Sequence, residues 1–263
     1  MAPMAAEERR RVLGFHLGHG TPHDSRTIML AELSTLFAST ATDAARADYA
    51  NAVVDDNVLG KTSAMNRKKS LKLLVRLYGL DAQTPLFRAL RKLWSDDEAS
   101  QPMLAALTAL ARDEVMLASW TFLHNVPYGS VVTSVQFGEA LQPKLPHLSP
   151  KMARSMAQNL AASWAQSGHL HGTVRKSRQR PRVTPAVVAL ALFIGYLQGR
   201  RGLRLFGTVW TEVLELSEVE LMSMAVAASQ RGLLQLLRSG PVVEVRFPGL
   251  LTAEEEELCH ESP

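Results

Sequence analysis

The chain has 263 residues, of which 46% are hydrophobic and 21% charged, and these values are ordinary for a soluble globular protein. Its single cysteine, Cys259, excludes an intramolecular disulfide and a cysteine-based zinc site, and is typical of a protein of the reducing cytoplasm. The longest apolar run, residues 186–197, is too short for a membrane helix, which requires roughly 20 residues. The sequence therefore predicts a cytoplasmic protein without a membrane segment.

Charge is distributed unevenly along the chain. The formal net charge is +4, but five of the 25 acidic residues lie in the last ten positions, within a predicted acidic tail at 253–263. Without these five residues the chain has 29 basic and 20 acidic residues, a net charge of +9. A basic body with an acidic tail suits a polyanionic partner, although a solubilising chain end is the simpler interpretation of the tail.

Residues 1–24 are expected to form a flexible N-terminal arm. His16, His19 and His23 lie there among Gly, Pro and Thr residues, without the i, i+4 spacing of a helical metal site. We therefore predict no metal ligands in this segment.

Residues 25–125 are predicted to form a helical domain. Apolar spacing indicates a helix pair within 27–49, a cationic helix at 66–77, and helices at 85–94 and 102–123. On the cationic helix, basic side chains share one side: Lys68, Lys69, Lys72 and Arg76. We interpret this side as a second candidate phosphate-binding patch, and an ordinary solvated helix face is the alternative.

Residues 126–185 are predicted to form a winged helix-turn-helix. A short helix at 133–141 is followed by a turn that contains proline and by a second helix, which Ser149 caps and Pro150 begins. One arc of this second helix, from Met152 to Trp164, is apolar. The opposite face carries side chains that suit the major groove of DNA: Lys151, Arg154, Ser155 and Gln158.

A basic wing is predicted directly after the second helix. Residues 169–174 and 182–184 have the pattern of two short strands around a loop at 175–181. This region supplies cations that can follow a sugar-phosphate backbone: Arg175, Lys176, Arg178, Arg180 and Arg182. From residue 141 to residue 184 the chain has eight Lys or Arg and no Asp or Glu. Solvated faces normally mix both signs, so the one-sided charge favours contact with nucleic acid.

Residues 186–252 are predicted to form a C-terminal helical region that ends in a strand. We expect a buried helix at 186–197, a helix with a capping box at 217–228, and another short helix at 232–238. A strand is predicted at 242–247, where it pairs with other strands or belongs to a second winged element. The expected fold is thus mainly α, a helical bundle with a winged helix-turn-helix and a short C-terminal β element.

Sequence signals of catalysis are missing. The chain has no Gly-rich phosphate loop of the P-loop or dinucleotide type, no G-x-S-x-G elbow and no set of kinase motifs. Its carboxylates are scattered, without a pair that can be placed together. We therefore predict a protein that is not an enzyme, with no catalytic residues, no cofactor and no metal.

The order of several segments resembles a known family. Residues 66–70 (NRKKS) lead into 74–77 (LVRL), and residues 85–90 (PLFRAL) and a helical region ending at Trp120 come before the winged-helix unit. This order resembles BrxA, a family of small accessory proteins of bacterial BREX phage-defence systems, over roughly residues 25–250. The resemblance implies a helical, non-enzymatic protein that binds double-stranded DNA and works beside a methyltransferase and ATPases.

The leading interpretation is a protein that binds double-stranded DNA, and other proteins of a defence system are further expected partners. One alternative is a protein-interaction scaffold, in which the winged helix docks onto a partner in a larger complex. The other is a transcription regulator with a discrete operator, which usually dimerises. The sequence contains no evident dimerisation helix and gives no oligomeric state.

Overall fold

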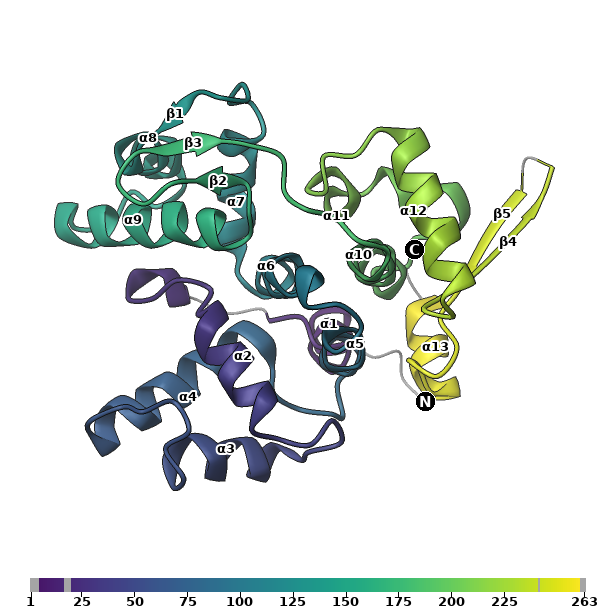
Figure 1. Ribbon diagram of the computed structural model, residues 1–263, viewed down its shortest axis with the longest axis horizontal. Helices are drawn as coiled ribbons and strands as arrows, with labels where there is room; N and C mark the ends of the chain where they lie inside the picture. The colour runs from purple at the N-terminus through teal and green to yellow at the C-terminus, as the bar shows by residue number, and fades with distance from the viewer. Residues whose placement is uncertain (1–4, 17–19, 241, 261–263) are drawn as a thin grey trace.

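The computed structural model describes residues 5–16, 20–240 and 242–260. The protein is mainly helical and contains small antiparallel sheets, one of which is a C-terminal hairpin. Figure 1 shows α6 and α10 near the centre, viewed almost along their axes. Helices α2, α3 and α4 lie below them, the unit from α7 to β3 lies at the upper left, and the β4–β5 hairpin projects at the right.

In the N-terminal half, the described residues form helices and no strand. Its first elements are α1 (Ala6–Val12), η1 (Pro22–Asp24), α2 (Leu30–Ala38), α3 (Arg46–Val54) and α4 (Ala64–Tyr78). They are followed by α5 (Pro85–Trp94), η2 (Glu98–Ser100), α6 (Gln101–Arg112) and α7 (Glu114–Leu123). The predicted cationic helix and the helix at 85–94 are confirmed. The region predicted as helical at 102–123 is divided at Asp113, whose carboxylate caps α7 by accepting from the Val115 amide at 2.9 Å.

The second half contains both sheets. Its elements are β1 (Val131–Val132), α8 (Ser134–Leu141), η3 (Gln142–Lys144), α9 (Pro150–Gln166), β2 (Leu170–His171) and β3 (Lys176–Arg178). The remaining ones are α10 (Pro185–Leu197), η4 (Gly202–Gly207), α11 (Val209–Glu212), α12 (Glu218–Gln230), β4 (Gln235–Ser239), β5 (Val242–Arg246) and α13 (Ala253–His260). Helix α10 is buried from Ala186 to Leu197 because α5, α6 and α12 pack around it. The predicted buried helix is therefore confirmed, and it forms the centre of the core.

The first sheet differs from the predicted wing in its return strand. Its strands are antiparallel in the order β1-β3-β2, with Val131 opposite Ser177 and Leu170 opposite Arg178. The return strand therefore lies at 176–178 and not at 182–184. The turn between β2 and β3 is shorter than predicted, and residues 179–184 instead lead away toward α10.

The predicted N-terminal arm is wrong for residues 5–16 and 20–24, while residues 1–4 and 17–19, which include His19, lie outside the described residues. Leu13 and Phe15 are buried in the core, and His23 is buried completely. The segment from Gly20 to Thr27 therefore packs against the helical body.

His23 is held in place by hydrogen bonds within a buried polar cluster. Its Nδ1 lies 2.7 Å from Asp113 Oδ2, and its Nε2 lies 2.9 Å from Ser163 Oγ on α9. The Ser163 hydroxyl also accepts from the Ile28 amide at 3.0 Å and donates to the Asn159 carbonyl at 2.8 Å. The Ser163 hydroxyl already donates and accepts hydrogen bonds, and Ser163 has no access to solvent. This Asp-His-Ser arrangement therefore connects the N-terminal segment to the helices and offers no exposed nucleophile.

Two C-terminal predictions also need correction. The helix predicted at 232–238 is absent, and most of this segment belongs to β4. The Leu-rich run fits the period of a helix or of a strand, and pairing with β5 favours the strand. Residues 253–260 of the acidic tail form α13, in which Glu255 is buried and its carboxylate accepts a hydrogen bond from Arg88, while residues 261–263 lie outside the described residues. The predicted strand at 242–247 is confirmed as β5, which ends at Arg246; residue 241 lies outside the described residues.

Candidate nucleic-acid interface

Local signals at the helix starts position α8 and α9. Thr133 caps α8 in a capping box with Gln136, whose side chain accepts from the Thr133 amide at 2.8 Å. Ser149 caps α9 by accepting from the Met152 amide at 3.3 Å, and proline occupies the first helical position. Both predicted helix starts are therefore confirmed.

One face of α9 anchors it in the core. Its buried side chains are Met156, Ala157, Leu160, Ala161, Ser163 and Trp164. The Trp164 indole donates to Ser119 Oγ on α7 at 2.8 Å, which fixes the orientation of the ring. Met152 was predicted to belong to this apolar arc but is exposed, so the buried face begins one turn later than the pattern indicates.

The opposite face of α9 carries three of the predicted contact residues at the surface. Lys151, Arg154 and Gln158 are exposed, and neither cation is paired with a carboxylate of the described residues. They form one stripe, because steps of three and four residues stay on one side of a helix. This stripe can approach a partner without breaking an existing ion pair.

Ser155 does not belong to the exposed stripe. It is half-buried, and its hydroxyl donates to the Asp24 carbonyl at 3.2 Å. On the same side of α9, Asn159 donates to the His23 carbonyl at 2.9 Å. The N-terminal segment therefore covers this edge of the predicted recognition face, and Ser155 serves to hold that segment.

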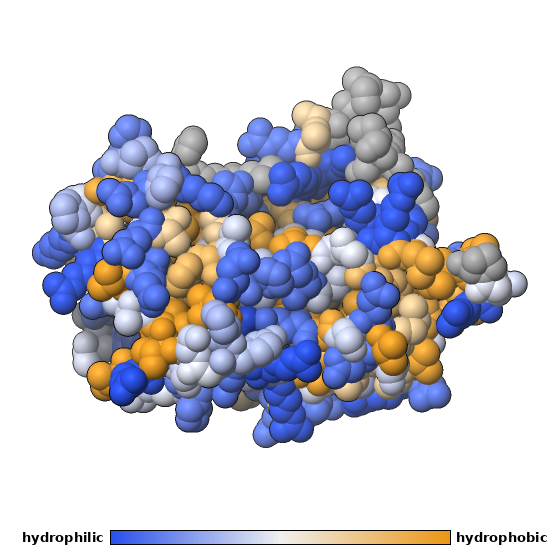
Figure 2. Space-filling view, turned by 90° about the horizontal axis from the view of Figure 1, so that it is seen from above, coloured by the Kyte–Doolittle hydropathy of each residue, from blue (hydrophilic) through white to orange (hydrophobic). Residues whose placement is uncertain are grey.

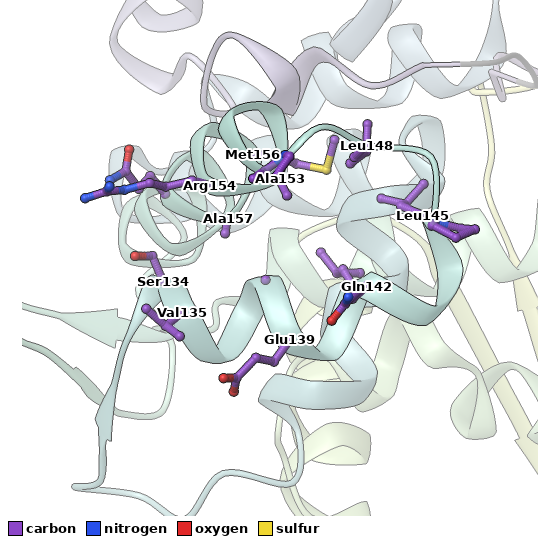
Figure 3. A pocket seen from close by; sticks show the side chains of 15 residues that line it. Ser134, Val135, Glu139, Gln142, Leu145, Leu148, Ala153, Arg154, Met156 and Ala157 are labelled. Carbon is purple, nitrogen blue, oxygen red and sulfur yellow. The ribbon is translucent and has the colours of Figure 1, made fainter.

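A groove lies between α8 and α9, with a volume of about 550 Å³. Figure 3 shows Val135 and Arg154 toward one end and Leu145 and Leu148 toward the other, with Glu139 on α8 at the rim. A smaller hollow of about 220 Å³ lies between α9 and the turn of the sheet. Its lining includes Gln158, Ala161, Val174, Arg175 and Lys176, so the stripe of α9 and the turn border one surface.

Arg175 and Lys176 lie at the predicted wing, but Arg178 does not reach the surface. The residue is only 2% exposed, and its guanidinium lies over the rings of Trp120 and Tyr128. The guanidinium donates to the Leu123 carbonyl at 3.2 Å and pairs with the Glu215 carboxylate. The prediction that Arg178 contacts nucleic acid is therefore wrong, because every face of its guanidinium already has a partner within the protein.

Arg180 and Arg182 are exposed on the segment that leads from β3 to α10. Arg180 lies 3.7 Å from Glu220 and 5.9 Å from the centre of the Tyr128 ring, so part of its charge is offset within the protein. Arg182 makes no ion pair with a carboxylate of the described residues. Of the two, Arg182 is the freer cation for a partner.

Three of the four residues predicted for the second basic patch lie at the surface. Lys68, Lys69 and Lys72 are exposed on α4, as predicted. Arg76 is half-buried, and its guanidinium donates to the Gly20 carbonyl. Arg76 therefore holds the N-terminal segment and is not a surface contact.

The N-terminal segment joins the two basic surfaces. It contacts α4 on one side and α9 on the other, and Figure 1 shows this short dark purple helix between the two. Arg26 is exposed on the same segment, and no periodic pattern around it in the sequence identifies it. Arg26 thus adds a cation between the lysines of α4 and the stripe of α9.

The two histidines of the predicted wing have different environments. His171 is exposed, but His169 is buried, with its Nε2 2.9 Å from the Val213 carbonyl. Burial lowers the pKa of His169 to about 3, so the ring is neutral at physiological pH. His169 is thus a core residue and not a phosphate contact.

Within the described part of the chain, no group of three or more His, Cys, Asp or Glu side chains could hold a metal ion. No helix there is long and apolar enough to cross a membrane. No protein-family model matches the chain, and no curated protein matches its sequence.

Proposed function

We propose that this protein binds double-stranded DNA through a winged helix-turn-helix formed by α7, β1, α8, α9, β2 and β3. The observation that carries the proposal is the unpaired cationic stripe of α9 beside the basic turn of a β1-β3-β2 sheet. A helix, a strand, a helix-turn-helix and a hairpin follow in the order that such a module requires. Because no Asp or Glu occurs between 141 and 184, no carboxylate of this segment opposes a phosphate backbone.

In this proposal α9 enters the major groove. An α-helix with its side chains is about 10–12 Å across, and the major groove is about 12 Å wide. Arg154 and Lys151 suit guanine edges or phosphates, and the Gln158 amide suits adenine. The stripe is open between the groove beside α8 and the covered edge at Ser155, so these three side chains are the base-proximal residues of the proposal.

The remaining exposed cations extend the contact to the DNA backbone. Arg175 and Arg182 are exposed on the wing side of α9, with Arg180 as a weaker contributor because of Glu220, whereas Lys176 is half-buried and its Nζ donates to the Thr173 carbonyl. On the other side, Arg26 and the three lysines of α4 continue the surface. A footprint with this many phosphate contacts has a steep salt dependence, because each contact releases counterions.

We also propose a setting for the DNA binding. The resemblance to BrxA suggests a cytoplasmic accessory component of a bacterial phage-defence system, without catalytic activity of its own and with other defence proteins as possible partners. An assay of phage resistance in cells that carry the complete defence system tests this part. Loss of resistance on deletion, restored by wild type and not by the variant Lys151→Glu/Arg154→Glu, is the expected result.

Fluorescence anisotropy tests the DNA binding itself. The probes are a random duplex of about 30 base pairs and its single strand, titrated at salt concentrations between about 50 and 200 mM. We expect the duplex to bind, and the variant Lys151→Glu/Arg154→Glu to weaken it by about 100-fold or more, since each lost contact costs about 1–3 kcal/mol. The triple variant Lys68→Gln/Lys69→Gln/Lys72→Gln should reduce the salt slope by up to about three, one for each phosphate contact.

The matched control is Arg238→Glu, which reverses an exposed charge on β4, at the other end of the molecule from α9. Its duplex affinity should stay within about twofold of wild type, since long-range charge effects are screened at these salt concentrations. Absence of binding to either probe at low salt would reject the DNA-binding role and leave the protein-interaction scaffold as the better hypothesis.

A further inference from the structure

The turn between β2 and β3 presents an apolar side chain at its tip. Residues 172–175 connect the two strands, and Val174 is 97% exposed, more than any other large hydrophobic residue of the described chain. Both neighbouring cations, Arg175 and Lys176, follow it directly. An isolated exposed valine is unremarkable, but this one stands at the outermost point of a basic hairpin beside the stripe of α9.

The conformation of the turn directs Val174 and Arg175 outward. Gly172 has φ +105°, and a Cβ at this position would lie 2.1 Å from the Arg175 carbonyl oxygen, so only glycine fits. Lys176 folds back over the turn, and its Nζ donates to the Thr173 carbonyl at 2.6 Å. Arg175 makes no side-chain hydrogen bond or ion pair with the described residues, so it is the available cation of the tip.

The dimensions of the tip suit the minor groove of a duplex. The axes of two paired strands lie about 4.8 Å apart, and the backbone atoms and side chains on either side make the pair wider than the minor groove, which is about 6 Å across. The strands therefore stay outside the groove, and only side chains at the tip can enter. A narrow groove at A·T pairs has enhanced negative potential, which attracts an arginine, and its sugar walls offer apolar contact. In a G·C pair the guanine amino group occupies the floor of the groove.

We propose that Arg175 and Val174 are specificity-determining residues that enter the minor groove next to the major groove occupied by α9. Arg175 contacts the floor of the groove at A·T pairs, and Val174 packs against the sugars that line it. The inference rests on the proposed duplex binding and adds to it a preference for DNA without a guanine amino group. In this inference the tip residues have a different role from Arg182, which contacts only phosphates.

Three synthetic duplexes test the inference by anisotropy: alternating A·T, alternating G·C and alternating I·C. Inosine lacks the amino group of guanine, so I·C resembles G·C in the major groove and A·T in the minor groove. We expect wild type to bind A·T and I·C about 5- to 10-fold more tightly than G·C. Arg175→Gln should abolish this difference, and Val174→Ser should reduce it to about half, because the apolar contact with the sugars is lost.

Arg182→Gln is the matched control, since it removes one exposed arginine of the same unit outside the tip. It should weaken binding to all three duplexes by the same factor and keep their ranking. The inference is overturned if I·C binds like G·C, which would assign the preference to the major groove, or if Arg175→Gln keeps the wild-type ranking. Absence of binding to all three duplexes would instead reject the proposed function, and the inference with it.

Discussion

Two parts of the molecule share an order of elements but differ in surface chemistry. The first contains α7, α8, α9 and the β2–β3 hairpin, and the second contains α10, α11, α12 and the β4–β5 hairpin. In each part the third helix begins behind a serine whose hydroxyl accepts from the third helical amide. Ser149 accepts from Met152 at 3.3 Å, and Ser217 accepts from Glu220 at 3.3 Å. The surfaces of α9 and α12 can therefore be compared position by position from the capping serine.

The side chains at matching positions differ in kind. The second, fifth and ninth residues after the serine of α9 are Lys151, Arg154 and Gln158. The corresponding residues of α12 are Val219, Met222 and Val226. Val219 is 80% exposed, so the outer stripe of α12 is apolar where that of α9 is cationic and polar. Between residues 205 and 230 the chain has four glutamates and no Lys or Arg. The two parts thus share an order of elements but present different chemistry at the surface.

Arg178 joins the two parts, and its removal should have the largest effect. The variant Arg178→Met leaves the Glu215 carboxylate, between α11 and α12, buried and unpaired. Breaking a buried ion pair in this way costs about 3–5 kcal/mol, so we expect a loss of that size in the free energy of unfolding. Urea denaturation followed by circular dichroism measures it.

Two further variants complete the test of the Arg178–Glu215 contact. Arg178→Met/Glu215→Leu should recover most of the loss, because no unpaired charge remains. Arg180→Met breaks the exposed pair with Glu220, at 3.7 Å, and should cost no more than about 1 kcal/mol. Equal losses for Arg178→Met and Arg180→Met would show that the buried contact does not join the two parts.

His169 makes a second contact between the parts, and it predicts a pH dependence. Burial lowers its pKa to about 3, whereas the ordinary value is 6.5, so the unfolded chain takes up a proton before the folded chain does. Stability is complete above pH about 6.5 and is lost as the pH falls below that value, by about 1.4 kcal/mol per pH unit. Between pH 6.5 and 5 we expect a loss of about 2 kcal/mol in the free energy of unfolding, measured by urea denaturation at each pH.

A histidine that faces solvent provides the control for this prediction. His169→Gln keeps a donor for the Val213 carbonyl but does not titrate, so its stability should fall less steeply between pH 6.5 and 5. His171→Gln replaces an exposed side chain two residues away, and this variant should keep the wild-type slope of stability against pH. The pKa of Asp113 lies below its ordinary value, so its contribution is lost only at lower pH. An unchanged slope in His169→Gln would contradict the prediction.

Local signals made the helices predictable. Ser149 with Pro150 and Ser217 with Glu220 are short-range caps, and each one lies at the predicted helix start. The buried face of α9 and the buried α10 follow from apolar spacing and composition, which act within a few residues. Such features need no knowledge of distant parts of the chain.

Long-range contacts account for the errors. Arg178 lies in a stretch with the composition of a basic wing, and distant partners explain its burial, among them Glu215, 37 residues away, and the Leu123 carbonyl, 55 residues away. The N-terminal segment is ordered by His23, whose partners Asp113 and Ser163 lie 90 and 140 residues away. Spacing within a segment contains no information on such partners. The candidate surface was therefore predicted best where side chains have no partner, as for Lys151 and Arg154.

The smallest expected effect comes from giving α12 the cations of α9. The variant Val219→Lys/Met222→Arg places two charges at the positions that match Lys151 and Arg154. The reciprocal variant, Lys151→Val/Arg154→Met, gives α9 the side chains of α12 and should lower duplex affinity. If the exposed side chains alone determined duplex binding, the gain in one variant would equal the loss in the other. We expect a gain of no more than about threefold, because weakly placed cations add only non-specific attraction.

Carboxylates beside the new cations are the physical reason for this asymmetry. Glu218 and Glu220 are exposed on α12 next to Val219, whereas residues 141–184, which include α9, contain no Asp or Glu. Anisotropy with the random duplex measures both variants under the same salt conditions. A gain equal to the loss would mean that two cations on a capped helix suffice for duplex binding. The expected inequality would mean that duplex binding requires cations on a surface without carboxylates, which α9 offers and α12 does not.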